Sequence, residues 1–339
     1  MKNQFENLKK ETESEIALED NLNIVPGDKL EELDIPPSEF LIRGLVPLNG
    51  ISVVSGKPCS FKSWILLLIA REVALGKPLF DQFETKQKRV LYLDEESSLA
   101  EQKRRWLMVK GSNPTPVYFS SMAGFKIDNR TQREYLLALC KKNDFKVLIV
   151  DSLRDVHHRN ENDSKDAQAI IDAFREFIQQ GITIIISHHN RKESFLNPKD
   201  PSQMLRGSDA LLAGLDALLA IENPKATEEA AELIITQAKL RQGRRTDPFK
   251  VNIFEKEGKM LFEYTGKIAT EESKMNEAKS AIKELLKQEG ELYQKQIIEY
   301  LVPLNHSPAT IRRAIKEMKD EELQTRMEGQ KLYFSNRAQ

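Results

Sequence analysis

Cysteine is scarce in this chain. Only two occur among 339 residues, Cys59 and Cys140, and they lie far apart in the sequence. Neither belongs to a C-x-x-C pair, so the sequence supports neither a disulfide framework nor a thiolate zinc site. This usage is typical of a reducing compartment, and we expect a cytoplasmic protein.

The chain also lacks an excess of charge of either sign and any long hydrophobic run. Lys and Arg number 51 against 52 Asp and Glu, for a formal net charge of −1. Nothing marks a globally basic protein, so any DNA contact must be local. The longest apolar run, "WILLLIA", covers about a third of a bilayer span, and the N-terminus is polar. We expect no signal peptide, transmembrane helix or membrane partner.

The length and the 40% hydrophobic content predict one large α/β domain and a smaller module. Residues 1–35 are polar with few aromatics, which indicates an N-terminal arm. We expect the main domain at residues 36–265. A polar stretch at 266–274 predicts a linker, and residues 275–339 form the C-terminal domain.

Apolar, β-branched runs recur along the main domain, each about as long as a strand that is buried on both faces. Helical patterns separate several of them, which predicts a mostly parallel, twisted sheet with helices on both sides. The runs are "GISVVSG", "RVLYLDEE", "VLIVDSL", "ITIIISHH", "ALLAIENP" and "ELIITQAKL". The following "FKVNIFEKEGKMLFEYTG" predicts a closing hairpin that turns at Glu257 and Gly258.

The segment "VVSGKPCSFKSW" fits a phosphate-binding loop, G-x-x-x-x-G-K-[ST], except that Phe61 replaces the second glycine. A buried strand leads into it and a helix follows, so backbone N–H groups at the helix start can hold phosphate. Lys62 can reach the outer phosphates and Ser63 can ligate Mg²⁺. The alternative is a chance match. We predict ATP and Mg²⁺ as cofactors, with nucleotide contacts from Ser55, Gly56, Lys57, Pro58, Cys59, Ser60, Phe61, Lys62, Ser63 and Trp64.

The departure at Phe61 affects turnover more than binding. The glycine of such a loop takes a backbone conformation that costs a residue with a Cβ about 1 to 2 kcal/mol. A bulky side chain can still point away from the phosphates. We therefore expect nucleotide binding, with the effect of Phe61 on hydrolysis left open.

Carboxylates follow two of the predicted strands. Asp151 ends "KVLIVD", the pattern of a Walker B metal ligand, and the alternative is a residue that caps a turn. Glu95 and Glu96 follow "RVLYLD", where an acidic group can polarise the water that attacks the γ-phosphate. The one that does not face the nucleotide is surface charge.

Two histidine pairs accompany these acids. His188 and His189 end a strand and must point to opposite faces, so one can serve as a sensor of the γ-phosphate. The other is packed or exposed. His157 and His158 form the second pair, and a zinc site that draws on both pairs is an alternative without support from cysteine or acidic spacing.

As an ordered set, the motifs in residues 36–265 resemble the RecA-like ATPases, and within them the hexameric plasmid replicative helicases of the RepA type. The pieces are "FLIRGLVPLNGISVVSGKPCSFKSW", "VLYLDEES", "VLIVDSLRDVHHRNENDS", "ITIIISHHNRK", "QMLRGSDALLAGLDALLAI" and "AKLRQGRR". The resemblance implies phosphate and Mg²⁺ binding by Lys62 and Ser63, and a Walker B role for Asp151. It favours Glu96 as the catalytic glutamate, because Glu96 takes the place of E in a "D-x-E" strand end.

The resemblance also implies a homo-oligomer, a ring or hexamer. "RGSDAL" resembles a loop that would place Arg206 against single-stranded DNA in a central channel or against a neighbouring subunit. "KLR" resembles a K-x-R pair, so Lys239 and Arg241 would reach into the neighbour's site and stabilise transition-state charge. For both segments the alternative is a solvated basic loop.

The C-terminal domain resembles a winged helix-turn-helix. Three helical patterns precede a hairpin at "LQTRMEGQKLYFS", and Ser307 and Pro308 begin the third helix. Its second motif helix would enter the major groove of duplex DNA. The chain has 11 Lys and Arg against 10 Asp and Glu from residue 275 onward, so the attraction is modest and protein docking is the alternative. Candidate DNA contacts are Thr310, Arg312, Arg313, Lys316 and Lys331.

Together these patterns predict a DNA-acting, Mg-ATP-dependent ATPase: a RepA-type replicative helicase or a related motor of a plasmid or mobile element. The alternative is a non-translocating, ATP-dependent regulator or loader with weak or no hydrolysis. A winged-helix repressor with a degenerate core is a third hypothesis, and it predicts no ATP binding. Ring size, polarity, DNA sequence preference and host pathway are not encoded in these motifs.

Overall fold

The computed structural model describes Gly27 and residues 39–112, 114–190, 209–226, 230–268, 271–319, 322–329 and 331–337. The N-terminal arm predicted at residues 1–35 lies outside the described residues, apart from Gly27. None of the described helices is long and apolar enough to cross a membrane.

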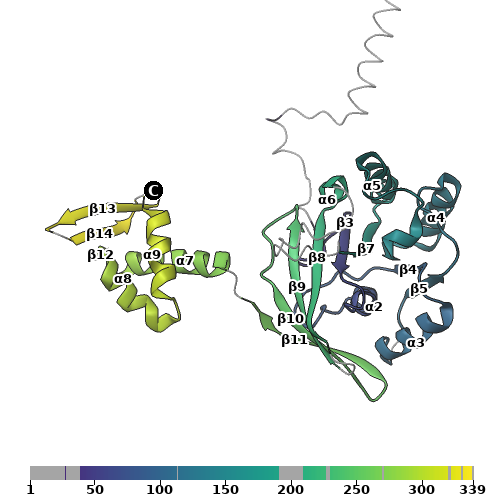
Figure 1. Cartoon of the computed structure of the whole chain (residues 1–339), viewed down its shortest axis with the longest axis horizontal. Helices are drawn as coiled ribbons and strands as arrows, with labels where there is room; N and C mark the ends of the chain where they lie inside the picture. Colours follow the sequence, from purple (N-terminus) through teal and green to yellow (C-terminus); the bar gives the residue numbers. More distant parts are fainter. Residues whose placement is uncertain are drawn as a thin grey trace, which may run out of the picture. The chain divides into compact units, whose positions relative to one another are not determined.

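A nine-stranded sheet forms the main domain (Figure 1), with the strand order β11-β10-β9-β8-β3-β7-β6-β4-β5. The strands from β8 to β5 in that order run parallel, and β9, β10 and β11 are antiparallel. This confirms the predicted fold class, α/β with a mostly parallel sheet. The strands are β3 (Ile51–Gly56), β4 (Val90–Asp94), β5 (Val117–Ser121), β6 (Val147–Asp151), β7 (Thr183–His189), β8 (Ala217–Ala226), β9 (Ala230–Leu240), β10 (Phe249–Lys256) and β11 (Lys259–Lys267).

The six predicted apolar runs correspond to β3, β4, β6, β7, β8 and β9, and the closing hairpin forms β10 and β11 and turns where expected. Glu257 and Gly258 have φ values of 53° and 69°, the left-handed pair of a tight hairpin turn. Strand β5 was not predicted, because it lies at the edge of the sheet and its residues are only partly buried. Since an edge strand of this kind is not buried on both faces, its sequence does not form a continuous apolar run.

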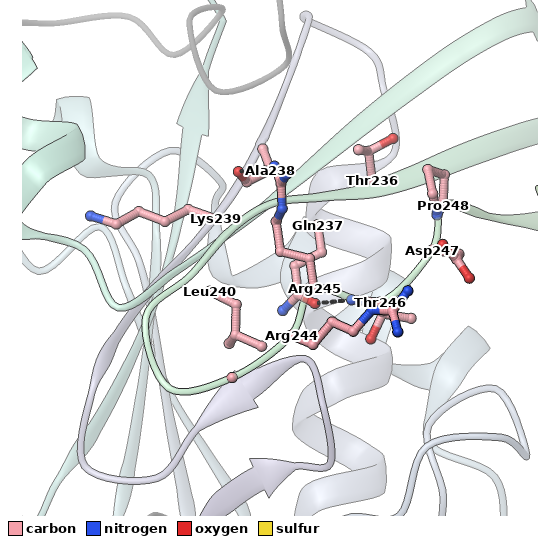
Figure 2. Close-up of a pocket in the computed structure, with 11 residues that line it drawn as sticks. Thr236, Gln237, Ala238, Lys239, Leu240, Arg244, Arg245, Thr246, Asp247 and Pro248 are labelled. Atoms are coloured by element: carbon pink, nitrogen blue, oxygen red, sulfur yellow. Dashed lines mark hydrogen bonds between the residues drawn. The ribbon is translucent and has the colours of Figure 1, made fainter. Parts of the chain in front are cut away.

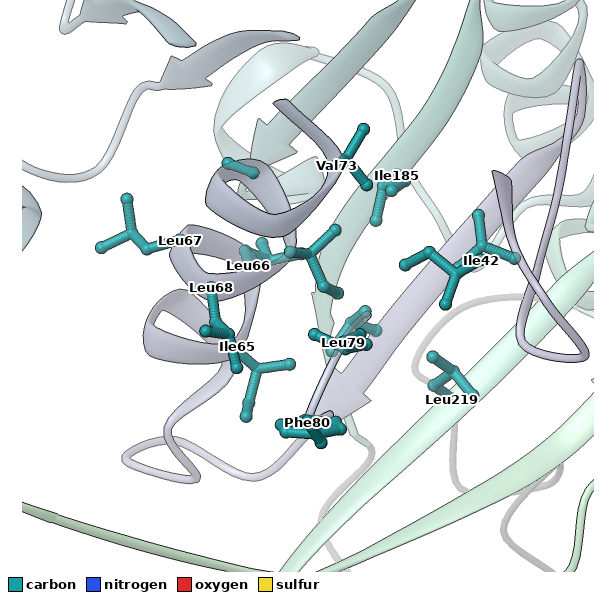
Figure 3. Packing of buried hydrophobic residues seen from close by; sticks show 14 of the residues in the cluster. Ile42, Ile65, Leu66, Leu67, Leu68, Val73, Leu79, Phe80, Ile185 and Leu219 are labelled. Atoms are coloured by element: carbon teal, nitrogen blue, oxygen red, sulfur yellow. The ribbon is translucent and has the colours of Figure 1, made fainter. Parts of the chain in front are cut away.

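Both faces of the sheet are covered, so alternate residues of each strand enter different hydrophobic clusters. Val54 and Ile185 belong to the cluster around α2 (Lys62–Leu75), which Figure 3 shows. Their neighbours Val53 and Ile184 belong to the opposite cluster. That cluster contains residues of α4 (Arg130–Asn143), α5 (Ser164–Ile178) and α6 (Asp209–Gly214). Burial on both faces explains why apolar residues on the central strands face both sides of the sheet.

Helix α2 is buried around most of its circumference, which is why it reads as an unbroken apolar run. It ends at Gly76, whose φ of 66° gives the left-handed C-cap that favours glycine. Helix α3 (Leu99–Val109) packs against the same cluster through Trp106 and Met108. The remaining elements of this domain are β1 (Phe40–Ile42), β2 (Val46–Pro47) and the short η2 (Leu153–Val156).

The C-terminal segment has its own hydrophobic cluster, which includes Ile282, Ile297, Ile311 and Phe334. Its helices are followed by a hairpin of β13 and β14, and a third strand, β12, pairs with β14. The hydroxyl of Ser307 accepts the Thr310 N–H at 3.1 Å and caps the last helix. The elements are α7 (Glu271–Glu289), β12 (Leu292–Tyr293), α8 (Gln294–Leu301), η4 (Val302–Leu304), α9 (Pro308–Met318), β13 (Leu323–Glu328) and β14 (Lys331–Asn336).

The segment predicted as a linker, 266–274, is largely secondary structure. Strand β11 continues to Lys267 and α7 begins at Glu271. Polar residues with good helix propensity can extend a helix without adding apolar periodicity. The hydrophobic pattern of the sequence therefore does not indicate the first turn of α7. The other domain boundaries remain predictions.

Candidate functional site

The carboxyl ends of four parallel strands meet at one edge of the sheet. Strand β3 ends there at Gly56, β4 at Asp94, β6 at Asp151 and β7 at His189. Asp94 is paired in register with Asp151, and Gly56 with His189. Ligands of open α/β sheets collect at this edge, so the topology brings most of the sequence-predicted site residues together.

The loop between β3 and α2 begins with a glycine that no other residue can replace without movement. A Cβ at Gly56 would lie 2.3 Å from the Ser60 hydroxyl and 2.9 Å from the Ile221 carbonyl oxygen. Lys57, Pro58 and Cys59 are exposed beyond it. The loop therefore folds tightly on itself and presents backbone to solvent just before a helix N-terminus.

Phe61 adopts the backbone conformation that the missing glycine would adopt. Its φ of 64° and ψ of 18° lie in the left-handed region, at a cost of about 1 to 2 kcal/mol. The ring is half-buried and packs against the hydrophobic cluster of α2. Burial of the ring offsets the backbone cost, and the loop keeps its shape without glycine.

Lys62 folds back over this loop. Its ammonium donates hydrogen bonds to the carbonyl oxygens of Lys57 at 2.8 Å and Gly56 at 3.2 Å. Burial lowers the pKa of Lys62, and the nearby carboxylates of Asp151 and Glu96 oppose that shift. In this position the Lys62 ammonium can give up its hydrogen bonds to these carbonyl oxygens and donate to phosphate oxygens instead.

Ser63 and Trp64 lie half-buried in the first turn of α2. The guanidinium carbons of Arg104 and Arg105 each lie 6.0 Å from the Trp64 ring centroid. The indole thus has α3 cations beside it at the start of the helix.

Asp151 is buried and held at both oxygens. The Tyr92 hydroxyl donates to Oδ2 at 2.9 Å, and the Ser187 hydroxyl donates to Oδ1. These donors come from the two strands that flank β6. A carboxylate fixed in this way retains lone pairs for a metal, and its orientation is set before any metal arrives.

Asp94 is a site residue that the sequence reasoning did not select. Its carboxylate is buried and accepts the N–H groups of Ser97 at 2.7 Å and Glu96 at 3.0 Å. Burial raises the pKa of Asp94 to about 6; the Ser97 N–H opposes the rise and Asp151 adds to it. The available signal was its position, since it ends a buried strand directly before two glutamates.

The structure separates Glu95 from Glu96. The Glu95 carboxylate accepts the N–H groups of Gly124 at 2.9 Å and Ala123 at 3.1 Å, so it anchors the loop after β5. Glu96 is exposed, and its charge opposes the lowering of the pKa values of Lys62 and His189. Of the two candidates, Glu96 therefore faces the phosphate loop.

The two histidines of β7 are separated in the same way. His189 is half-buried, and its pKa is lowered by burial and by Lys62, while Glu96 opposes the shift. His188 points to the other face, where its Nε2 lies 3.7 Å from a carboxylate oxygen of Glu161. His189 is thus the sensor candidate on the side of the phosphate loop.

Glu161 also accepts a hydrogen bond from His157, at 3.0 Å, and all three side chains are buried. Burial raises the pKa of Glu161, but His157 and His188 outweigh it and the net shift is downward. His157 and His188, one from each histidine pair, therefore both contact the carboxylate of Glu161. Within the described ranges, no group of three or more His, Cys, Asp and Glu side chains could hold a metal, which removes the zinc alternative there.

Lys239 and Arg241 bind the end of α6. The Lys239 ammonium donates to the carbonyl oxygens of Leu212 at 2.7 Å and Ala213 at 3.1 Å. Arg241 donates to Ala213 at 2.8 Å and pairs with Asp216 at 3.3 Å. Both side chains donate to carbonyl oxygens that lack a hydrogen-bond partner within the helix, as the last carbonyls of a helix do.

The register places this pair far from the phosphate loop of the same chain. Leu240 lies opposite Ala217, and Ala217 pairs with Ser52 at the amino end of β3. The phosphate loop follows the carboxyl end of β3. A role for Lys239 and Arg241 at a nucleotide would thus require a second subunit.

The candidate DNA contacts differ in how they are bonded. Arg206 lies outside the described residues. Arg313 lies 3.5 Å from a Glu317 oxygen, Thr310 shares a hydrogen bond with Ser307, and Lys331 lies 4.6 Å from the Tyr293 ring centroid. Arg312 and Lys316 are exposed on α9.

A model of the AAA domain family matches residues 12–194, which is more than half of the chain. No curated protein matches. Among solved structures, a KaiC-like protein from the hyperthermophilic archaeon Pyrococcus horikoshii OT3 is 13% identical, with a TM-score of 0.46 over 67% of this chain and 97% of that one. A DnaB-like replicative helicase, studied with its primase, is 12% identical with a TM-score of 0.47. That match covers 69% of this chain but only 64% of the helicase, less than two thirds of its length.

Proposed function

The chain belongs to the AAA domain family, and on that premise we propose that it is a Mg-ATP-binding ATPase that acts on DNA. The observation that carries the proposal is the convergence of the phosphate loop, Asp151, Glu96 and His189 at one edge of the sheet. Their order along the chain is the order of the motifs that resemble RecA-like ATPases.

Two observations fit a phosphate ligand. Gly56 leaves no space for a Cβ beside Ser60 and Ile221, so the loop can fold as tightly as a phosphate cradle requires. The hydroxyls of Ser55 and Ser60 are buried without a hydrogen-bond partner in the described part of the chain. Buried hydroxyls normally have partners, and a bound phosphate could supply them.

We assign the roles as follows. Lys62 and the N–H groups at the start of α2 bind the phosphates, and Ser63 and Asp151 hold Mg²⁺. When bound, Mg²⁺ neutralises charge that develops on the transferred phosphoryl group. Glu96 orients and deprotonates the attacking water, and His189 hydrogen-bonds the γ-phosphate or that water.

The finer proposal is a replicative helicase of the RepA type, or a related motor of a plasmid or mobile element, that works as a ring in the cytoplasm. It rests on the ordered motifs and on the K-x-R pair, which lies too far from its own phosphate loop to act in cis. The C-terminal domain would act as a winged helix on duplex DNA, with Arg312 and Lys316 as exposed cations of α9.

The second candidate is a non-translocating regulator or loader that holds ATP and hydrolyses it slowly. The left-handed backbone of Phe61 favours this regulator, because Phe61 replaces the usual glycine directly before Lys62. Strand separation driven by ATP would support the helicase, and binding without steady turnover would support the regulator.

The experiment is ATP turnover with and without single-stranded DNA, together with the mass of the assembly in solution. Wild type is compared with Lys62→Ala, Glu96→Gln and, as a control, Glu95→Gln. We expect Lys62→Ala to lose binding, Glu96→Gln to bind ATP without turnover, and Glu95→Gln to keep both. Equal inactivity of all four proteins, with no ATP bound, would refute the ATPase.

A further inference from the structure

A pocket lies at the end of the sheet opposite to the phosphate loop. It has a volume of about 540 Å³ and lies between the last residues of β9 and the segment that leads to β10. The lining includes Thr236, Lys239, Arg244, Arg245, Thr246 and Asp247. Since β9 ends beside the amino end of β8, this pocket and the phosphate loop lie at different edges of the sheet.

Two neighbouring arginines dominate this pocket. Arg244 and Arg245 are both exposed, and no ion pair with a carboxylate involves either of them in the described portion of the structure. Asp247 is only two residues away and also lines the pocket. Arg245 donates to the Ala238 carbonyl oxygen at 3.3 Å, which leaves most of its five donors available.

The other cations nearby are already engaged. Figure 2 shows Lys239 extending away from the arginines, and its ammonium bonds carbonyl groups of α6. Arg241 pairs with Asp216. The positive charge that remains available to a ligand is therefore that of Arg244 and Arg245.

A buried glutamine holds the arginine segment against the sheet. Gln237 accepts the Thr246 N–H at 2.8 Å, as Figure 2 shows, and donates to the Leu45 carbonyl oxygen at 3.2 Å. Its exposed fraction is 2%. The Thr246 hydroxyl adds a bond to the Gly44 carbonyl oxygen at 3.1 Å. The backbone that carries the arginines is thus fixed before any ligand binds, which lowers the entropic cost of binding.

We propose that this pocket, which we call the arginine pocket, binds backbone phosphates of a single-stranded nucleic acid. Guanidinium groups match phosphate oxygens in a planar, two-pronged geometry, and they are less strongly hydrated than ammonium groups. Two exposed arginines on a fixed segment at a sheet edge suit a strand that passes over the surface. The formal net charge of the chain is −1, so nucleic-acid contact has to come from a local site of this kind.

The inference rests on the DNA-directed part of the proposed function and names a surface for it. The test uses the full chain, a fluorescein-labelled oligothymidylate and, separately, inorganic pyrophosphate. The variant is Arg244→Gln with Arg245→Gln. The matched control is Lys103→Gln with Lys256→Gln, which removes the same charge from two exposed lysines elsewhere.

We expect the arginine variant to bind the oligonucleotide about tenfold more weakly or worse, and the control to bind as wild type does. The slope of log affinity against log salt should become shallower by about 1.4, because each phosphate contact to a single strand contributes about 0.7. Pyrophosphate should compete only weakly for the site. Unfolding midpoints of both variants should match that of wild type, since neither arginine is buried.

Equal affinity and salt slope for the arginine variant and the control would overturn the proposal, and DNA action through another surface would then stand. Tight pyrophosphate binding without oligonucleotide binding would overturn it in favour of a free-phosphate site. ATP binding is measured in the same samples with a fluorescent ATP analogue. If ATP does not bind but the arginine variant still loses the oligonucleotide, the ATPase proposal fails and the arginine pocket stands.

Discussion

Asp94 and Asp151 lie directly opposite each other on neighbouring parallel strands, and both side chains are buried. Burial raises the pKa of Asp94 to about 6, and the charge of the Asp151 carboxylate adds to the rise. Asp151, by contrast, is bonded at both oxygens by the hydroxyls of Tyr92 and Ser187. The pair thus combines a fixed metal-ligand candidate with a titratable neighbour.

The first prediction concerns pH and stability. Because folding raises the pKa of Asp94 from 3.8 to about 6, the folded state binds more protons than the unfolded state between those values. This contribution to stability is present below pH 3.8 and is lost as the pH rises to about 6. Asp94→Asn removes it, so the difference in unfolding free energy between variant and wild type should change across this interval and be constant above it. Urea denaturation at several pH values measures this difference, and parallel curves would contradict the prediction.

Asp94 should also matter for turnover. Asp94→Ala removes the acceptor for the N–H groups of Glu96 and Ser97, so Glu96 loses its fixed position. We expect kcat for ATP to fall about tenfold or more with little change in KM. Asp94→Asn keeps a carbonyl acceptor and is the matched control, with kcat near wild type. An equal loss in both variants would show that charge, not anchoring, is what Asp94 contributes.

Replacement of Phe61 separates backbone strain from packing. Phe61→Ala removes the ring from the cluster of α2 and keeps a Cβ in the left-handed region. Phe61→Gly removes the ring and relieves the strain. We expect the glycine variant to be more stable than the alanine variant by about 1 kcal/mol. Chemical denaturation of the two proteins gives this difference directly, and an alanine variant of equal or higher stability would mean that the loop has changed its conformation.

The K-x-R pair can be tested by mixing subunits. Arg241→Ala and Lys62→Ala are each expected to lack ATP turnover. In the first variant no site receives an arginine from the adjacent subunit, and in the second no site binds the phosphates. In a mixed assembly, some interfaces combine an intact Lys62 with an intact Arg241 from the adjacent subunit. We expect activity to return on mixing. If the mixture stays inactive while the mass shows mixed oligomers, Arg241 only caps α6.

Gln237 should support both stability and the arginine pocket. Gln237→Ala leaves the Thr246 N–H and the Leu45 carbonyl without their partner at a buried position. We expect a loss of about 2 kcal/mol in the free energy of unfolding. Oligonucleotide affinity should also fall, although no charge has changed. Unchanged affinity in the folded variant would show that the arginines do not depend on this anchor.

The central strands could be predicted from the sequence because burial on both faces favours runs of apolar residues over strict alternation. The partly buried edge strand β5 and the two-residue β12 lack that signature. The AAA family match supports the predicted P-loop ATPase core, whereas the RepA-type role and the winged helix remain predictions.

The choice within residue pairs needed the fold. A period of two shows that His188 and His189 face opposite ways, but only the position of Glu161 shows which one is buried on the far side. Likewise, Glu95 is distinguished from Glu96 by N–H groups from Ala123 and Gly124. These two donors lie far from Glu95 in the sequence, so no local sequence pattern predicts the contact.

The carboxylate that joins His157 to His188 has a further consequence for β7. A slip of this strand by one residue would exchange its two faces, so that His188 would turn to the face of the phosphate loop and away from Glu161. The slipped arrangement would separate the His188 ring from the Glu161 carboxylate, which also accepts a hydrogen bond from His157. Glu161 therefore favours the observed register of β7 from the side away from the phosphate loop, and so bears on which histidine is the sensor candidate.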